Sequence, residues 1–458
     1  MTTGGSGGGG GVAMPGGMGG GPSSGPVTGI TVDTYLTASG EMKVPGKPED
    51  IRITALVPSS VGTFTELLAS IAPDGTFSIP QVPPGTFYLR IDFPGKDGGF
   101  VNPLFIVTSE RTFDLGAVFL GRPDSKRATI MPTELEVKAS GLSWQENDEL
   151  ELYSREIGGL ERLDQFGAMA GDAEVTTTVD LSEDWRDLGL VEGSKGDQLL
   201  VMYKATAPTG TSEYQAVRSS FVAPTFDHQD GTKAMASGTL QPLAQQSASV
   251  TWNQAAIAAL ASDVNAGAKA GGHYLRIYAE ENPASLSSDP ELLTASFSPE
   301  QGKDQRLDLA FGNPFSGRSL MASAATWFRH PDERVDIGFD IGSWGPLDAM
   351  TARPIGVTMT PPRALKVEGS KVSWDAPAVG SPNGYEVIVY EKEDMGGWWF
   401  RMRIWTAGRS VILPPGLIRK TGPYVIQVEA NNTFDPRAPF HHHASGSYAQ
   451  TVSPAYEP

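Results

Sequence analysis

Hydrophobic and polar residues alternate along most of the chain in short runs of four to nine residues. An alternation with a period of two predicts strands with one buried face, because successive side chains point to opposite sides of a sheet. Turn-forming segments such as Ser381-Pro-Asn-Gly384 and Leu413-Pro-Pro-Gly416 separate the runs. In the last hundred residues the alternating runs are Lys371–Asp375, Tyr385–Tyr390, Trp398–Trp405 and Tyr424–Ala430. The pattern therefore predicts an all-β fold built from many short strands.

The spacing of four landmarks in this C-terminal region resembles that of a fibronectin type III domain. They are Trp374 on the second strand, Tyr385 on the third, the Leu413-Pro414 turn, and Tyr424 on the sixth. The resemblance implies a seven-stranded sandwich, in which the Tyr424 hydroxyl bonds back to upstream backbone and fixes a corner. Such a fold hosts binding and spacing roles more often than catalysis.

A second resemblance lies near the N-terminus. Asp74-Gly75 suits a tight hairpin turn, Phe77 and Ile79 alternate inward, and Pro83-Pro84-Gly85 leads into the strand Phe87–Ile91. This order resembles the prealbumin-like sandwiches that include carboxypeptidase regulatory-like domains. The resemblance implies a non-catalytic stalk or adaptor.

The middle of the chain repeats one strand pattern at domain spacing. Tyr153, Tyr278 and Tyr390 each follow an apolar pair and precede a polar exit that ends in Glu, and they lie 125 (278 − 153) and 112 (390 − 278) residues apart. A spacing of this size corresponds to one sandwich per repeat. An apolar residue on the preceding strand lies 16 positions before the tyrosine in the first and last copies, Val137 (153 − 137) and Trp374 (390 − 374). In the middle copy the corresponding residue, Trp252, lies 26 positions before it (278 − 252).

A short helix accounts for the ten extra residues of the middle copy. Asn253 is suited to cap a helix that carries Ile257, Leu260 and Val264 on one side and ends near Gly267. We predict that this helix lies in a loop between the two sheets.

Together these patterns predict tandem immunoglobulin-like or fibronectin type III-like sandwiches behind a disordered Gly/Ser/Pro tether. The predicted ranges are 1–27 for the tether, 28–122 for the carboxypeptidase regulatory-like sandwich, 123–237 for a second sandwich, 238–352 for a third with the helix, and 353–458 for the fibronectin type III-like sandwich.

Composition narrows the classes of partner. The chain has 53 acidic and 35 basic residues and a formal charge of −18, which disfavours nucleic acid and anionic membranes. It contains no cysteine, which excludes disulfides and thiolate metal sites. The Gly-rich tether is typical of the segment after a lipid-anchor cysteine on exported bacterial proteins. We hypothesise that an export signal and an anchor preceded it, which would place the protein outside the cell or at its surface, as an outer-membrane lipoprotein for example. The alternative is a cytoplasmic protein with a flexible tail.

The sequence indicates no catalytic centre and no cofactor. Gly21-Pro-Ser-Ser-Gly25 has the letters of a nucleophile elbow but lies in the tether, without the flanking strand and helix that the motif needs. His441 and His443, with Asp435 as a third ligand, form a weak metal candidate whose alternative is a polar loop. The isolated His228, His273 and His330 are interpreted as surface or satisfied residues.

One strand carries a candidate binding surface. In Trp398–Trp405 the alternation places Trp398, Phe400, Met402 and Ile404 toward the core. The opposite face then presents Trp399, Arg401, Arg403 and Trp405. Rows of indole and guanidinium groups stack on sugar rings or form protein-binding hot spots, but they also stack on each other simply to shield a sheet.

These observations favour a non-enzymatic, exported and surface-attached protein that acts as a spacer or as a protein-interaction and adhesion module, with a protein or glycan partner. An alternative is a carbohydrate-binding accessory protein that uses the Trp/Arg strand. A third reading is an enzyme whose site lies between domains.

Overall fold

The computed structural model describes residues 25–456 except 60–62, 95–99, 164–167, 184–185, 211, 265–268, 283–288, 299–302, 330–338, 393–397, 415–422 and 442–445. Strands dominate this part of the chain, which confirms the predicted all-β fold. The predicted tether lies outside the described residues, apart from its last few positions. Within the described ranges, no helix is long and apolar enough to cross a membrane.

The strands form four groups that follow the chain. The first group comprises β1 (Val27–Ile30), β2 (Val32–Thr37), β3 (Gly40–Pro45), β4 (Arg52–Pro58), β5 (Phe64–Leu68), β6 (Ser70–Ile71), β7 (Thr76–Ile79), β8 (Phe87–Pro94), β9 (Phe100–Thr108), β10 (Thr112–Asp114) and β11 (Val118–Leu120). The second comprises β12 (Glu134–Ser140), β13 (Glu149–Ser154), β14 (Gly159–Leu163), β15 (Glu174–Asp180), the 3₁₀ turn Gly193–Lys195, β16 (Leu200–Thr209), β17 (Ser212–Val222) and β18 (Lys233–Thr239).

The third group contains the two α-helices of the described chain. It comprises β19 (Gln241–Pro242), β20 (Gln245–Trp252), α1 (Gln254–Val264), β21 (Lys269–Ala279), β22 (Glu291–Phe297), β23 (Gln305–Gly312), β24 (Leu320–Arg329), β25 (Phe339–Pro346) and α2 (Leu347–Thr351). The fourth comprises β26 (Arg363–Glu368), β27 (Lys371–Asp375), β28 (Gly384–Lys392), β29 (Trp398–Thr406), β30 (Ser410–Ile412), β31 (Tyr424–Asn431) and β32 (Gly446–Val452).

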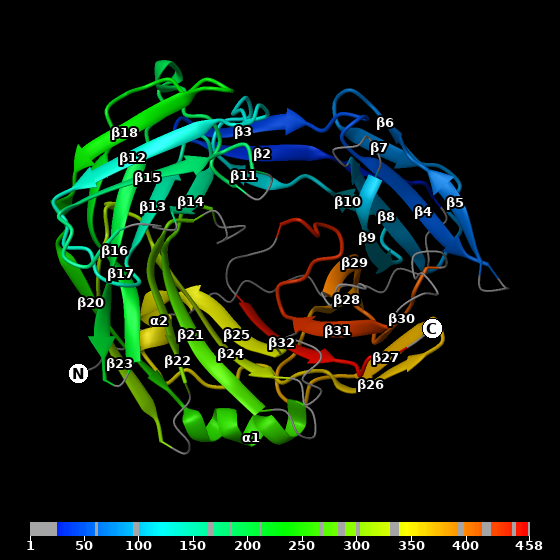
Figure 1. Cartoon of the computed structure of the whole chain (residues 1–458). Coiled ribbons are helices and arrows are strands. Elements are labelled where there is room, and N and C mark those ends of the chain that lie inside the picture. Colours follow the sequence, from blue (N-terminus) through cyan, green and yellow to red (C-terminus); the bar gives the residue numbers. More distant parts are fainter. Residues whose placement is uncertain are drawn as a thin grey trace, which may run out of the picture.

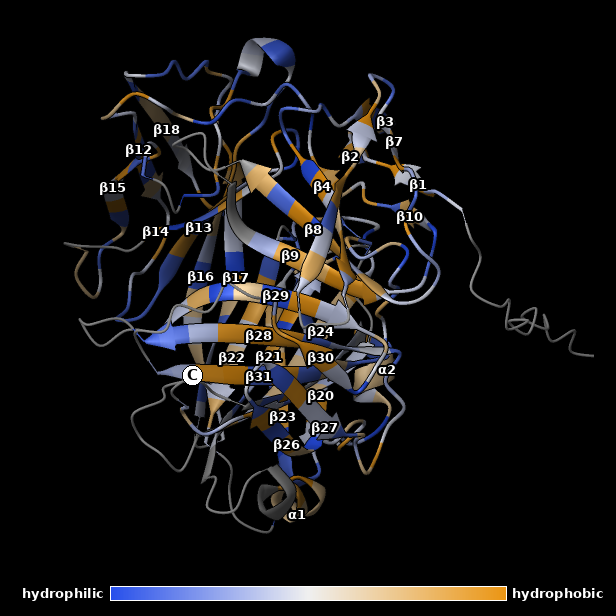
Figure 2. Cartoon of the chain, turned by 90° about the vertical axis from the view of Figure 1, so that its right-hand side faces the viewer, coloured by the Kyte–Doolittle hydropathy of each residue, from blue (hydrophilic) through white to orange (hydrophobic). Residues whose placement is uncertain are grey.

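Each group packs two sheets face to face. In the second group, the small sheet β15-β12-β18 faces the strands β14, β13, β16 and β17. Val137 of β12, Leu152 of β13 and Val201 of β16 are fully buried in one shared cluster between these layers. In the first group, Phe87, Leu89 and Ile91 point inward while polar residues alternate with them along β8, as the colouring in Figure 2 shows. Burial of one face of each strand is therefore the main source of the sandwich packing.

The larger sheets of all four groups join edge to edge into one 17-stranded sheet. Antiparallel pairing of β17 with β22 joins the second group to the third, and β25 with β32 joins the third to the fourth. Parallel pairing of β9 with β29 joins the first group to the fourth. The sheet curves around a common centre, and the smaller sheets lie on its outer side (Figure 1).

A bridge between the first and second groups closes this curve. The sheet β11-β2-β3 crosses from one group to the other (Figure 1). Just after β11, the amide of Arg122 donates to the carbonyl of Glu156 (2.7 Å), and the guanidinium of Arg122 donates to the Asp197 carboxylate (2.9 Å). A Cβ on Gly158 would lie 2.0 Å from the carbonyl oxygen of Leu120, so glycine is needed where the two backbones meet.

Several local predictions agree with the structure. Helix α1 begins after Asn253, whose Oδ1 accepts a hydrogen bond from the amide of Ala256 (3.0 Å). Asp74-Gly75 forms the turn between β6 and β7, with φ of +80° at Gly75. The Tyr424 hydroxyl donates to the Glu391 carboxylate (3.1 Å), a side-chain partner where the fibronectin resemblance implied backbone. The predicted domain ranges stay a prediction, because strands pair across the junctions and β18 spans the boundary at 237 and 238.

Candidate functional site: a cavity on the inner face of the sheet

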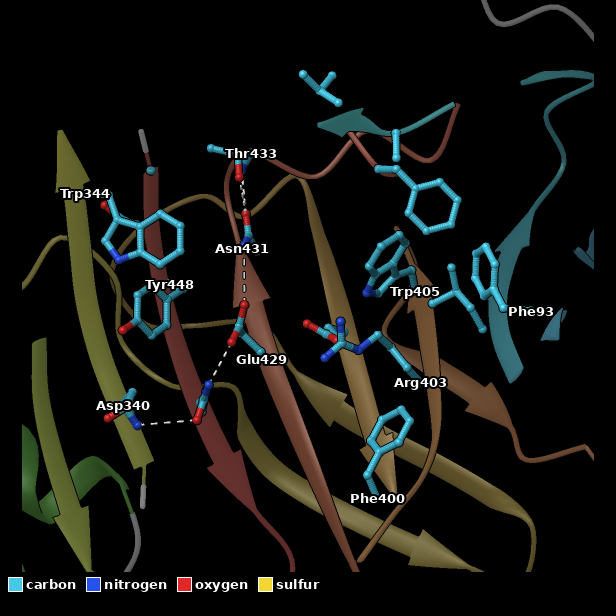
Figure 3. A pocket seen from close by; sticks show the side chains of 18 residues that line it. Phe93, Asp340, Trp344, Phe400, Arg403, Trp405, Glu429, Asn431, Thr433 and Tyr448 are labelled. Atoms are coloured by element: carbon cyan, nitrogen blue, oxygen red, sulfur yellow. Dashed lines mark hydrogen bonds and ion pairs between the residues drawn. The ribbon is translucent and has the colours of Figure 1, made fainter. Parts of the chain in front are cut away.

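A cavity of about 820 Å³ lies where the first, third and fourth groups meet on the inner face of the large sheet. Its walls are formed by β25, β28, β29, β31 and β32, with contributions from β8, β9 and the segment before β11 (Figure 3). This volume lies within the range of small-molecule sites in proteins.

Strand alternation explains why polar side chains face this cavity. On β31, Val428 and Ala430 are fully buried in the sandwich core, and the residues between and after them, Glu429 and Asn431, face the cavity. On β28, Val387 lies in the core and Glu386 lines the cavity. The inner face is therefore the polar face of the strands, enclosed by the curvature of the sheet.

Strand β29 departs from simple alternation because it contains an extra residue. Met402 pairs with Val389 of β28, but the next pair is Phe400 with Tyr390, which leaves Arg401 in a bulge. Phe400 therefore lines the cavity together with Arg403 and Trp405. The prediction that Phe400 points into the core with Met402 is wrong for this reason.

The four predicted binding residues of this strand do not form one exposed row. Trp405 is 3% exposed and packs against Phe434 and Phe440, with ring centroids 5.9 Å apart in each case. Arg401 forms an ion pair with Glu391, and Arg403 forms one with Glu386 at the cavity wall. Trp399 is 56% exposed and lies outside the cavity lining. The structure thus brings Arg403 and Trp405 together at the cavity and separates Trp399 from them.

Aromatic rings cover two sides of the cavity. On one side, Trp344 of β25 meets Tyr448 of β32 at 5.9 Å between centroids and 73° between planes. Gly342 makes room for the Tyr448 ring, because a Cβ there would lie 2.4 Å from it. On the other side, Trp405 stands opposite this pair (Figure 3), and Phe440 packs against Trp405.

Three carboxylates converge on the same space, which the sequence did not predict. Glu429 accepts hydrogen bonds from the side-chain amides of Gln450 (2.7 Å) and Asn431 (3.3 Å), and burial together with the nearby Glu386 raises the pKa of Glu429 to about 7. Burial also raises the pKa of Glu386, although its partner Arg403 opposes the shift. The three carboxylates belong to Asp340, Glu386 and Glu429, which are separated by 46 (386 − 340) and 43 (429 − 386) positions along the chain.

Asp340 is the third carboxylate. Its backbone amide donates to Oε1 of Gln450 (3.5 Å), which connects β25 to the Glu429 network (Figure 3). Among the described residues, no hydrogen bond or ion pair reaches its carboxylate, and burial raises its pKa to about 6. Asp340 is therefore a desolvated acid without a cationic partner among the described side chains, whereas Glu429 is a desolvated acid on which Arg403 acts only in part. Such groups are typical of functional sites.

Farther around the inner face, buried charges are paired with each other. Lys204 of β16 forms ion pairs with Glu151 and Glu291 (3.5 Å for Glu291), and all three side chains are at most 2% exposed. Arg162 also binds Glu291 (2.7 Å). This cluster joins the second and third groups and contrasts with the cavity, where three carboxylates share one guanidinium.

Two of the three weak metal candidates, Asp435 and His441, lie within the described residues, and each has another charged neighbour. Asp435 is engaged by Arg437 (3.2 Å), and His441 lies 3.8 Å from Asp114. His443 lies outside the described residues, within which no group of three or more His, Asp or Glu side chains is arranged to hold a metal ion.

His273 and His228 are not part of the cavity lining. His273 is buried against Trp252, at 4.7 Å between ring centroids, and burial lowers its pKa to about 4. His228 is buried near the carbonyl of Thr232 (3.3 Å). His330 and the serines of the Gly21–Gly25 segment lie outside the described residues.

No protein-family model matches the chain, and neither does any curated protein. Among solved structures, the chain is similar to a tetra-tandem repeat in the extending region of a large adhesion protein, with 15% identity over 95% of this chain and 100% of that one, and a TM-score of 0.13. It is also similar to the FN1–FN3 domains of chicken CNTN1, with 10% identity over 95% and 94% of the two chains and a TM-score of 0.15. At these TM-scores the overall arrangements differ, and the similarities carry no argument about function.

Proposed function

We propose that the protein is a non-enzymatic binding module in which the joined sandwiches form a rigid frame around a ligand-binding cavity. The observation that carries this proposal is the cavity itself, where aromatic rings and desolvated carboxylates from three groups of strands converge. A protein that served only as a spacer would gain stability from apolar residues or paired charges at Asp340 and Glu429. The excess of acids over cations in the lining favours a binding role.

In this proposal the carboxylates bind a ligand and do not act as an acid and base. Glu386 is held by Arg403, and Glu429 is held by two amide donors, which favours fixed geometry over proton transfer. Two carboxylates beside aromatic rings are also the arrangement of glycosidases. Aryl glycosides and esters are therefore the substrates to test, and the binding proposal predicts no turnover of either. Turnover that disappears in Glu429→Gln would overturn the non-enzymatic proposal.

A cavity-filling variant tests the binding role directly. Ala117 lines the cavity without contributing charge. We expect Ala117→Phe to abolish the binding of cavity ligands found by ligand-observed NMR screening while the circular dichroism spectrum stays unchanged. A screen hit that binds Ala117→Phe and the wild type with equal affinity does not occupy the cavity. A library in which no compound binds the cavity would count against the proposal.

We also propose export and attachment at the cell surface, with a protein or glycan as the larger partner. The Gly-rich segment Thr3–Pro26 and the acidic composition support this placement. Protease treatment of intact cells of the source organism should remove the protein if it is surface-attached. Complete protection in intact cells, lost on lysis, would place it inside.

A second candidate function is carbohydrate binding through Trp399. Its favouring observation is the 56% exposure of this indole on β29, since exposed aromatic rings stack on sugar rings. Glycan-array binding that is lost in Trp399→Ala would support this function. Equal binding by the variant would remove it.

A further inference from the structure

We infer that the cavity takes an organic cation, with an ammonium or quaternary ammonium group held between Asp340, Glu429 and the Trp344–Tyr448 pair. This inference rests on the proposed binding function and adds the chemical class of the ligand. It depends on charge, on the position of the two acids, and on the aromatic wall beside them.

The charged side chains of the cavity lining favour a cation. The cavity lining includes three carboxylates and one guanidinium, and the guanidinium of Arg403 is paired with Glu386. Arg403 also acts on Glu429, but one guanidinium cannot balance three carboxylates, so the lining keeps an excess of acidic side chains, with Asp340 farthest from compensation. A neutral ligand such as a sugar would displace water from these acids without supplying an opposite charge, which is costly. A cation removes that cost.

The positions of the two acids on the sheet also suit a cation. Asp340 and Glu429 lie on β25 and β31, with β32 between them, so the two strands are about 10 Å apart at the usual strand spacing. Gln450 of the middle strand contacts both sides, accepting from the Asp340 amide and donating to the Glu429 carboxylate. The two acids thus lie on either side of Gln450, so that a ligand group placed over Gln450 has one acid on each side.

An aromatic wall lies beside the two acids. Trp344 and Asp340 are on the same face of β25, four residues apart, and Tyr448 stands next to them on β32 (Figure 3). The Tyr448 hydroxyl is fixed by the hydroxyl of Tyr274 (3.1 Å). Indole and phenol faces attract cations, and aromatic rings combined with carboxylates are a recurrent way of binding alkylammonium groups. The wall and the acids together favour a cation over an anion or a neutral sugar.

The test compares choline with 3,3-dimethylbutan-1-ol, in which a carbon atom replaces the charged nitrogen. We expect choline to bind the full-length protein at least about tenfold more tightly than its neutral counterpart, by NMR titration. Asp340→Asn, Glu429→Gln and Trp344→Leu should each weaken choline binding about tenfold or more. Phe119→Leu, an aromatic substitution at an exposed position outside the cavity lining, should leave the affinity unchanged.

The outcomes separate this inference from the function it rests on. Equal affinity for both probes, tighter binding of glucose, or full choline affinity in the double variant Asp340→Asn/Glu429→Gln would overturn the cation assignment while a cavity ligand remains. Absence of binding by every cavity probe, in protein whose unmodified cavity is verified by crystallography, would overturn the binding function itself. The amide variants keep the shape of the acids, so thermal unfolding will show whether a lost affinity reflects lost folding.

Discussion

At the scale of single residues, the inner face contains two kinds of buried acid. Asp340 and Glu429 have pKa values raised to about 6 and about 7 by burial, above their ordinary values of 3.8 and 4.5. The folded protein therefore binds protons more tightly than the unfolded chain between about pH 4 and pH 7. Because stability falls with rising pH wherever the folded state holds more protons, these acids destabilise the fold at neutral pH.

Replacing both acids with amides should remove this pH-dependent loss. We expect Asp340→Asn/Glu429→Gln to unfold at a higher temperature than the wild type at pH 8, and the difference to shrink toward pH 5. The measurement is thermal unfolding across this pH range. Asp304→Asn, at an exposed position, is the control and should show no such trend. A constant difference at all pH values would contradict the assignment.

The second kind of buried acid forms an ion pair, and removal of its cationic partner should strongly destabilise the fold. Lys204→Met leaves Glu151 buried at 0% exposure without its nearest cation. We expect a loss of about 3–5 kcal/mol in the free energy of unfolding, measured with urea. Arg306→Met removes a pair with Asp308 that is more than 60% exposed, and should cost less than about 1 kcal/mol. Lys204→Met/Glu151→Met should recover part of the loss, since Glu291 keeps Arg162.

At the scale of elements, the sequence predicted where strands and turns lie better than it predicted which face of a strand each side chain occupies and what that face packs against. Alternation, the Asn253 cap and the Asp74-Gly75 turn are local signals, and the structure contains all three elements. The bulge at Arg401 adds one residue without any composition signal, and it reverses the face on which Phe400 lies. The cavity acids looked like solvent-facing positions, because alternation does not show whether the polar face of a strand is enclosed.

Two glycines on β25 allow the wall of the cavity to be tested. A Cβ at Gly342 would lie 2.4 Å from the Tyr448 ring, whereas nothing lies within 4 Å of one at Gly345. We therefore expect Gly342→Ala to displace the ring and to lower the free energy of unfolding by about 1–3 kcal/mol. Gly345→Ala should be neutral or slightly stabilising. Equal unfolding midpoints for both variants would show that the ring moves aside without cost.

At the scale of the whole molecule, edge pairing changes how the sandwiches relate to each other. A sandwich with free edge strands risks pairing with other chains. Here β9, β17, β22, β25, β29 and β32 use those edges to join neighbouring groups. Sequence reasoning recognised the repeated units but not these junctions, because edge pairing depends on how four units meet in space. The cavity exists only as a result of the junctions, so site and assembly are coupled.

The closed arrangement makes a prediction about size in solution. A compact chain of this length has a radius of gyration of about 22 Å, whereas four sandwiches in an extended row would give roughly 40 Å. We expect small-angle X-ray scattering of the full-length protein to give a value much nearer the first. Disruption of the β9–β29 junction by Ile404→Pro should increase the radius and abolish ligand binding together, because the first group supplies one wall of the cavity. A radius near 40 Å for the wild type would mean that the four groups do not close around a centre, and the cavity would have no enclosing walls.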